Sequence, residues 1–429
     1  MQKSTIKQRF KSAIRRGTGE AYLIARENPK IDFSKYILNA AANDLSYHPQ
    51  VEPSHANYIA ELVYVSNKKD ELVKDILKLL TEGESEGYGL DQLFNISSIF
   101  AKEGNIEARK AIYQRFDKEI THDSVEFLRG EGEILEIDGL DGLKYIAETK
   151  GRIIANNSEV WEDSWTVDSF QEENPLFNVY KELEKAAEGN KYIQIYLDAI
   201  KKHKFKRGKN KKSKHDYNFV KEKIDSLKIF GPYIAENLTN KELKKLADDF
   251  LKETNRLKQE KYLRVFSIVK FPSDNYQPIL KIAKGTNSRK DRLVEYAVKA
   301  LKHFSGDDIR EFAIEKLSKT NKHDDYLMLL VSNYREGDSK LLKSIAEKYK
   351  NEKMIHSLVW SYVEIYRANQ TKECQEPLEA IYDKLNCGLH RRDIVEIMID
   401  SNALPSKIRQ EIRYDSSKKI RKLSKKIEK

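Results

Sequence analysis

The sequence predicts an all-α protein built as an α-solenoid, a stack of antiparallel helix pairs. Three observations support this fold class. The chain has 429 residues but only 18 glycines and 9 prolines, and a scarcity of these residues favours helices with short connections. Apolar residues recur with helical spacing, and no region shows the sustained two-residue alternation of a strand. The helices also recur in pairs at intervals of 30–43 residues, a period typical of solenoid repeats.

The helical periodicity is clearest in the second half of the chain. Four segments place apolar residues at intervals of three and four, which predicts helices that each bury one face. In chain order, these segments are 291–304, 307–317, 339–350 and 354–366. Short polar stretches separate them, as expected between antiparallel neighbours. We therefore expect successive helices to pack side by side.

Three segments share a further pattern, in which an acidic or amide residue precedes an arginine and then small and large apolar positions. They read GNIEARKAIYQRF, GDDIREFAIEKL and DSSKKIRKLSKKI. In this pattern the chain resembles HEAT and armadillo repeat proteins. The resemblance implies a right-handed α-solenoid in which the acid caps a helix and the arginine bridges to the neighbouring repeat. The residues predicted for these structural roles are Arg109, Asp307, Arg310, Asp415 and Arg421.

Charge is distributed unevenly along the chain. Residues 1–200 carry 25 basic and 35 acidic side chains, whereas residues 201–429 carry 53 basic and 33 acidic ones. We predict three parts: acidic N-terminal helical repeats at 1–203, a basic loop at 204–215 and basic C-terminal HEAT-like repeats at 216–429. Such asymmetry bears on partners and solubility rather than on the fold.

The basic loop belongs to the stretch KKHKFKRGKNKKSKH, residues 201–215, in which nine of fifteen residues are basic and none is acidic. With so few apolar residues it cannot bury a helix face, so we predict an exposed loop. Its charge density would give weak, sequence-independent affinity for nucleic acid, although such runs often serve only solvation. The predicted nucleic-acid contacts are Lys204, Lys206, Arg207, Lys209, Lys211 and Lys212.

An acidic segment with two of the three tryptophans lies at residues 159–175, EVWEDSWTVDSFQEENP. On a helix, two residues four apart share a face, so the tryptophans would point the same way. Three interpretations stay open: the segment binds a partner, its indoles fill the core, or its acidic side chains dock onto basic residues of the same chain. The predicted partner-binding residues are Trp161, Glu162, Asp163, Trp165 and Asp168.

The sequence gives little reason to expect a cofactor, a membrane-spanning segment or structural disulfides. The only cysteines are Cys374 and Cys387, which excludes a disulfide framework and favours a reducing cytoplasm. Cys387 and His390 lie close in sequence, but a structural zinc site needs four ligands, so we expect no metal and no cofactor. No apolar run approaches the ~20 residues that span a bilayer. We therefore expect a cytoplasmic protein without a membrane partner.

The function that these observations favour is a non-catalytic HEAT-like scaffold that binds a macromolecule. We expect a protein partner, with weak nucleic-acid binding through the basic second half as a further possibility. The alternative is an enzyme. With tryptophans and carboxylates on a HEAT-like fold, the chain resembles the bacterial alkylpurine DNA glycosylases. In those enzymes aromatic side chains hold the modified nucleotide and a carboxylate supports bond cleavage. That resemblance implies activity on alkylated bases.

Overall fold

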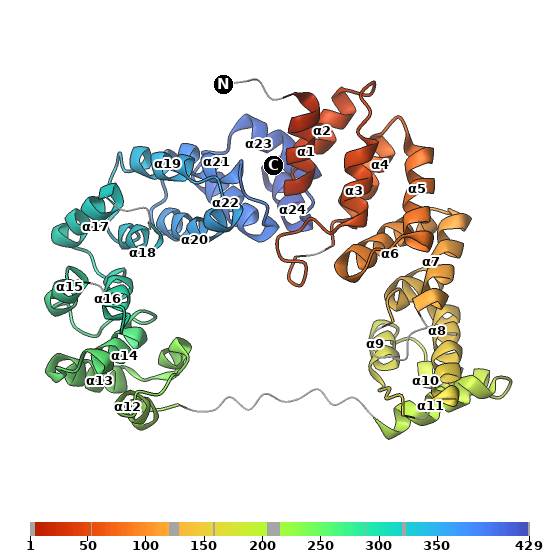
Figure 1. The fold of residues 1–429 in the computed structure, drawn as a ribbon, viewed down its shortest axis with the longest axis horizontal. Coiled ribbons are helices and arrows are strands. Elements are labelled where there is room, and N and C mark those ends of the chain that lie inside the picture. Colours follow the sequence, from red (N-terminus) through yellow and green to blue (C-terminus); the bar gives the residue numbers. More distant parts are fainter. Residues whose placement is uncertain are drawn as a thin grey trace. The chain divides into compact units, whose positions relative to one another are not determined.

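The structure is a computed structural model. It describes residues 5–52, 54–119, 128–157, 159–203, 215–286, 288–319 and 323–427. These residues form 24 α-helices and four short 3-10 helices, and they contain no strand (Figure 1). The predicted all-α class is therefore confirmed. None of the described helices combines the length and apolar character needed to cross a membrane.

The chain forms two compact units. Unit 1 comprises Met1–Lys209, Asn386–Gly388 and Gln410–Lys429, and unit 2 comprises Asn210–Leu385 and Leu389–Arg409. This division follows packing, whereas the three parts expected from the sequence follow charge. The end of the chain thus packs with its beginning inside unit 1.

Unit 1 is built mainly from the first eleven helices and the last one. Their bounds are α1 (Ile6–Arg16), α2 (Glu20–Glu27), α3 (Ser34–Ala42), α4 (Ala56–Val65), α5 (Lys69–Glu82), α6 (Gly87–Lys102), α7 (Ile106–Glu119), α8 (Glu131–Asn156), α9 (Trp165–Glu173), α10 (Val179–Ala187), α11 (Lys191–Lys202), η4 (Ile412–Tyr414) and α24 (Lys418–Ile427). Apolar faces meet in two cores, one from α1 to α8 and one from α8 to α11.

Helix α8 connects the two cores of unit 1. Its 26 residues are interrupted at Gly139, which has a φ of 55° and a non-helical ψ of −123°. Glycine adopts this left-handed φ at little cost because it has no Cβ. On either side of the break, Ile134 belongs to the first core and Leu143 to the second. The helix therefore supports the region between the cores.

The C-terminal segment of unit 1 packs against α1 and α2. The rings of Tyr22 and Tyr414 stack with centroids 4.2 Å apart, and the Ser416 amide donates a hydrogen bond of 2.8 Å to the Gly17 carbonyl. A Cβ at Gly19 would lie 1.9 Å from the Glu411 carbonyl oxygen, so only glycine fits there. Residues almost 400 positions apart thus form one packed region.

Unit 2 contains the remaining helices, except that the first residue of α22 and the last two residues of α23 belong to unit 1. Their bounds are α12 (Tyr217–Asp225), η1 (Pro232–Asn237), α13 (Asn240–Lys252), α14 (Arg256–Phe266), α15 (Gln277–Ala283), α16 (Leu293–Leu301), α17 (Asp307–Lys319), α18 (Asp324–Leu327), η2 (Met328–Leu330), α19 (Ser339–Lys348), α20 (Glu352–Ala368), η3 (Lys372–Cys374), α21 (Gln375–Tyr382), α22 (Gly388–Asp400) and α23 (Ser406–Glu411). The four segments with the clearest periodicity form α16, α17, α19 and α20, and their apolar faces are largely buried.

The three arginines of the repeat-like pattern each contact a carboxylate of another segment. Arg310 lies in α17 and pairs with the residue that precedes α19. Arg421 lies in α24 and pairs with a residue of α4. Both pairs therefore link two helices. The nitrogen–oxygen distances are 3.0 Å for Arg109–Asp138, 2.6 Å for Arg310–Asp338 and 2.5 Å for Arg421–Glu61.

The two acids of the same pattern lie next to helix starts. Asp307 is the first residue of α17 and contacts the exposed side chain of Arg335. Asp415 is buried and accepts a hydrogen bond of 2.8 Å from the Ser417 amide, immediately before α24. A negative charge near a helix N-terminus is favoured by the helix dipole. Within the described part of the chain, only the Asp415 carboxylate of these two acids accepts a hydrogen bond from a backbone amide.

Candidate binding cavity

Unit 1 contains a cavity of about 590 Å³ beside the second core. Its residues come from α6, from the segment that precedes α8, from α8 itself and from the turn that leads into α9. We call it the tryptophan cavity. It is lined by Asp91, Leu128, Arg129, Gly130, Glu131, Gly132, Lys150, Trp161, Glu162, Asp163, Trp165 and Thr166.

A tight turn presents the two indoles. The Asp163 carboxylate accepts a hydrogen bond of 2.8 Å from the Trp165 amide, so the turn ends where α9 begins. Val167 and Phe170 anchor α9 in the second core. The side chains at positions 161 and 165 face the cavity instead and remain 51% and 54% exposed. The indoles are thus available to a ligand, and the interpretation that they fill the core is wrong.

A buried lysine lies between two glutamates in the cavity wall. The Lys150 ammonium is 2.8 Å from Glu131 Oε1 and 3.0 Å from Glu162 Oε1, and only 4% of the Lys150 side chain is exposed. Thr166 donates a further hydrogen bond of 3.2 Å to Glu131 Oε2. This triad joins the start of α8, its third quarter and the tryptophan turn. It therefore fixes the position of the tryptophan turn relative to α8.

Burial changes the protonation of this triad. Removal from water is the largest influence on Glu162 and raises its pKa to about 7, although the attraction of Lys150 acts in the opposite direction. Burial also acts to lower the pKa of Lys150, but the attraction of Glu131 and Glu162 outweighs it, so the pKa is raised. The attraction of the two glutamates thus favours the charged form of the lysine, whereas burial favours the protonated form of Glu162.

A second charged pair forms another part of the wall. The Arg129 guanidinium contacts the Asp91 carboxylate and donates a hydrogen bond of 2.9 Å to the Gly87 carbonyl. The next residue, Gly130, has a φ of 98°, and a Cβ there would lie 2.5 Å from the Phe94 ring. The chain can therefore turn from Arg129 into α8 only with glycine at this position.

The lining as a whole is acidic. It contains four carboxylates against one lysine and one arginine, a net charge of −2 when all groups are ionised. Aromatic faces attract cations through their quadrupole, and tryptophan does so best. Two half-exposed indoles beside a surplus of carboxylates thus suit an ammonium or guanidinium group.

The structure brings together four of the five predicted partner-binding residues. Trp161, Glu162, Asp163 and Trp165 all line the tryptophan cavity. Asp168 lies outside this lining, and its carboxylate accepts hydrogen bonds of 2.7 Å from both Ser164 and Tyr180. Their role in binding stays a prediction. The predicted nucleic-acid contacts of the basic loop lie outside the described residues.

Sequence reasoning left open that the acidic segment contacts basic residues of the same chain, but it did not identify the two basic residues of the cavity. Lys150 carried a usable signal, because it continues the apolar face of Leu143, Ile146 and Ala147 at the spacing of one helix face. A lysine on a buried face needs an anionic partner. Arg129 carried no comparable signal, since nothing in its immediate sequence distinguishes it from an exposed arginine.

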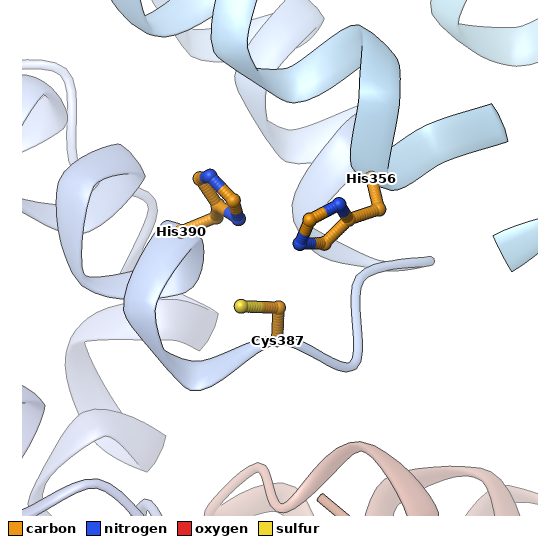
Figure 2. Close-up of side chains that lie close together, drawn as sticks. All are labelled: His356, Cys387 and His390. Atoms are coloured by element: carbon orange, nitrogen blue, oxygen red, sulfur yellow. The ribbon is translucent and has the colours of Figure 1, made fainter. Parts of the chain in front are cut away.

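Among the described residues, one group could hold a metal ion. The side chains of His356, Cys387 and His390 each offer one ligand atom, and these atoms lie within 4.8 Å of one another (Figure 2). The sequence had paired Cys387 with His390 but had not included His356, which lies 31 residues before the cysteine.

Comparison with known proteins leaves the chain without an assigned family. No model of a protein family matches it, and no curated protein is significantly similar to it in sequence.

Proposed function

We propose that this protein is a HEAT-like helical scaffold that binds a protein partner, and that the tryptophan cavity holds a lysine or arginine side chain of that partner. The observation that carries the proposal is the pair of half-exposed indoles in a cavity whose lining has four carboxyl groups against one lysine and one arginine. The cavity lies in the acidic part of the chain. An acidic surface attracts a basic segment of a protein and repels the phosphates of nucleic acid.

The proposed architecture is a right-handed α-solenoid of antiparallel helix pairs. Helices that recur at short intervals support it, as do the arginines at positions 109, 310 and 421 with their carboxylate partners. Arg256 forms a similar contact of 3.1 Å with Asp291, which precedes α16. Solenoids offer extended surfaces to partners, and this suits a scaffold.

The test uses a small probe with one cationic side chain. Nα-acetyl-lysine methylamide is titrated into the full chain and followed by tryptophan fluorescence and ligand-observed NMR, next to the norleucine analogue, which lacks the charge. We expect millimolar affinity, and about tenfold weaker binding of norleucine, because a cation–π contact contributes about 0.5–2 kcal/mol. Equal binding of the two probes would contradict a cation site.

Tryptophan variants locate the binding site. Trp161→Ala and Trp165→Ala should each weaken lysine binding. Trp360→Ala is the matched control, because this third tryptophan is also 51% exposed and lies on α20 in unit 2. A partner captured from lysate should be retained by the control, lost by the cavity variants and resistant to nuclease. Loss of the partner after nuclease treatment would assign the surface to nucleic acid instead.

The same cavity favours one second candidate, an enzyme that acts on alkylated DNA bases. Its indoles and its carboxylates at Glu162 and Asp163 are the residue types that such glycosylases use. The acidic lining disfavours a DNA backbone, so we rank this function second. Release of free base from alkylated DNA, abolished by Asp163→Asn and retained by Trp360→Ala, would establish the enzyme and overturn the scaffold.

A further inference from the structure

Two helices of unit 1 carry basic side chains and no acidic one. Helix α1 reads IKQRFKSAIRR and helix α24 reads KKIRKLSKKI. This composition stands out in unit 1, because residues 1–200 carry 25 basic and 35 acidic side chains. The two helices therefore concentrate positive charge in a unit whose larger part is acidic.

Packing turns the lysines of α24 outward. Ile420, Leu423 and Ser424 are buried and attach this helix to unit 1. Because residues three and four apart share a face of a helix, the remaining positions form one continuous side. The exposed residues of α24 are all lysines, at positions 418, 419, 422, 425 and 426. The solvent side of α24 thus presents a row of ammonium groups.

Helix α1 meets the start of α24. The carbonyl of Gly17, directly after α1, accepts a hydrogen bond of 2.8 Å from the amide of Ser416, two residues before α24. Lys7 and Lys11 of α1 are also exposed. We call these two lysines and the five of α24 the lysine surface.

The lysine surface has no carboxylate partners of its own. Within the described residues, none of its seven lysines forms an ion pair. Exposed lysines on other helices of unit 1 do form such pairs, since Lys110, Lys144 and Lys185 each contact an acid three residues away. Neighbouring ammonium groups repel one another. A bound anion would relieve this repulsion, so the surface attracts polyanions.

We propose that the lysine surface binds the phosphate backbone of nucleic acid without base specificity. Protein interfaces favour aromatic residues and arginine and are depleted in lysine, whereas α24 contains no aromatic residue and the one aromatic side chain of α1, Phe10, is buried. Lysine is a compact charge that suits phosphate oxygens. Sequence readout requires hydrogen bonds in a defined geometry to the edges of bases, and a row of flexible lysines supplies charge instead.

The lysine surface is separate from the tryptophan cavity. Helix α1 belongs to the first core of unit 1, whereas the cavity lies beside the second core. Figure 1 shows α1 at one end of this unit and α9 at the other. The surface is also distinct from the basic loop at 204–215, which lies outside the described residues. Nucleic-acid binding here therefore does not depend on the partner proposed for the cavity.

The test titrates the full chain into a short fluorescently labelled DNA duplex and follows anisotropy over a series of salt concentrations. Binding through phosphates releases counterions, so the logarithm of the affinity should fall linearly with the logarithm of the salt concentration. Duplexes of unrelated sequence should bind equally. Absence of binding by the wild type at low salt would refute the proposal without reference to any variant.

A variant with four glutamines on α24 removes most of the surface. Glutamine keeps a high helix propensity, and the replaced side chains are exposed, so the melting temperature should not change. Each lost phosphate contact flattens the log–log slope by about 0.9 units, so we expect a slope flatter by about two to four units and more than tenfold weaker binding at ~100 mM salt. The substitutions are Lys418→Gln, Lys422→Gln, Lys425→Gln and Lys426→Gln.

Two controls separate local charge from net charge and from folding. Four lysines of α13 in unit 2 are equally exposed but share their helix with three acids, and their replacement by glutamine removes the same charge; they are Lys241, Lys244, Lys245 and Lys252. This control should keep the slope of the wild type, as should arginine at the four substituted positions of α24. Equal losses in the α13 and α24 variants, or a loss that arginine does not restore, would overturn the proposal.

An acidic protein is the competing partner, and poly-L-glutamate is its probe. We expect the DNA duplex to bind more tightly than poly-L-glutamate of equal charge. Tighter binding of poly-L-glutamate, abolished by the α24 glutamines, would assign the lysine surface to an acidic protein and refute its assignment to nucleic acid.

Discussion

Replacement of the buried lysine should destabilise unit 1 in a pH-dependent way. Lys150→Met keeps much of the side-chain volume but leaves the carboxylates of Glu131 and Glu162 without their cation. Removal of one partner from a buried ion pair typically costs about 3–5 kcal/mol. We expect a loss of this size in the free energy of unfolding at pH 8, which lies above the pKa of about 7 of Glu162.

The sign of the pH dependence follows from Glu162. Its folded pKa of about 7 exceeds the ordinary value of 4.5, so the folded state binds the proton more tightly. Its stabilising contribution is complete below about pH 4.5 and is lost as the pH rises through about 7. Without Lys150 this pKa should rise further. A carboxyl that stays protonated in the folded state from pH 8 to pH 6 adds about 2.7 kcal/mol to the free energy of unfolding over that range. The same change of pH adds about 1.4 kcal/mol in the wild type.

The destabilisation by Lys150→Met should thus be about 1.4 kcal/mol smaller at pH 6 than at pH 8. Urea unfolding measures it, in a Trp360→Phe background in which only the two cavity tryptophans report. Lys144→Met is the matched control, because Lys144 forms a more exposed pair with Asp141 on the same helix and should matter by less than about 1 kcal/mol. Equal losses at both pH values would refute the reasoning.

Three further substitutions and one scattering measurement test the fold and the charge assignments. Arg310→Ala should lower the free energy of unfolding by about 1–3 kcal/mol, because it leaves the buried Asp338 carboxylate without its paired cation; an unchanged urea midpoint would contradict this. Gly19→Ala should destabilise unit 1 by more than about 1 kcal/mol, since its Cβ would collide with the Glu411 carbonyl, whereas Gly189→Ala, which meets no atom within 4 Å, should not. Replacement of the six predicted nucleic-acid contacts of the basic loop by serine should weaken polyanion binding. It should also flatten the slope of log affinity against log salt by about one unit per lost phosphate contact. Unchanged binding would show that the loop serves only solubility. Small-angle scattering should give a radius of gyration above the roughly 22 Å of a compact globule of this length, and a smaller value would count against an open solenoid.

Local patterns predicted the helices well because a helix buries residues according to short-range spacing. The apolar faces of α16, α17, α19 and α20 were readable from intervals of three and four, and they are largely buried as expected. The all-α class followed from the same signal, together with the scarcity of glycine and proline. These features require no knowledge of which helices meet.

The candidate sites were readable only in part. The acidic segment identified Trp161 and Trp165 by composition, but it could not show whether the indoles were buried or exposed. Their exposure depends on α9, which is anchored through other residues of the same helix. The pairing of Glu162 with Lys150 depends on the path of the chain between them, which no local pattern specifies.

The sequence alone determined the helical class, the amphipathic faces and the uneven distribution of charge. Only the tertiary structure decided that the C-terminal segment packs against α1 and α2, that a buried ammonium lines the same cavity as the tryptophans, and that the rings of His356 and His390 lie side by side. The physical reason is that the spacing of apolar residues states which face of a helix is buried but not which helix covers it. Contacts between distant segments arise from the packing of many helices, and each site uses side chains that this packing brings together.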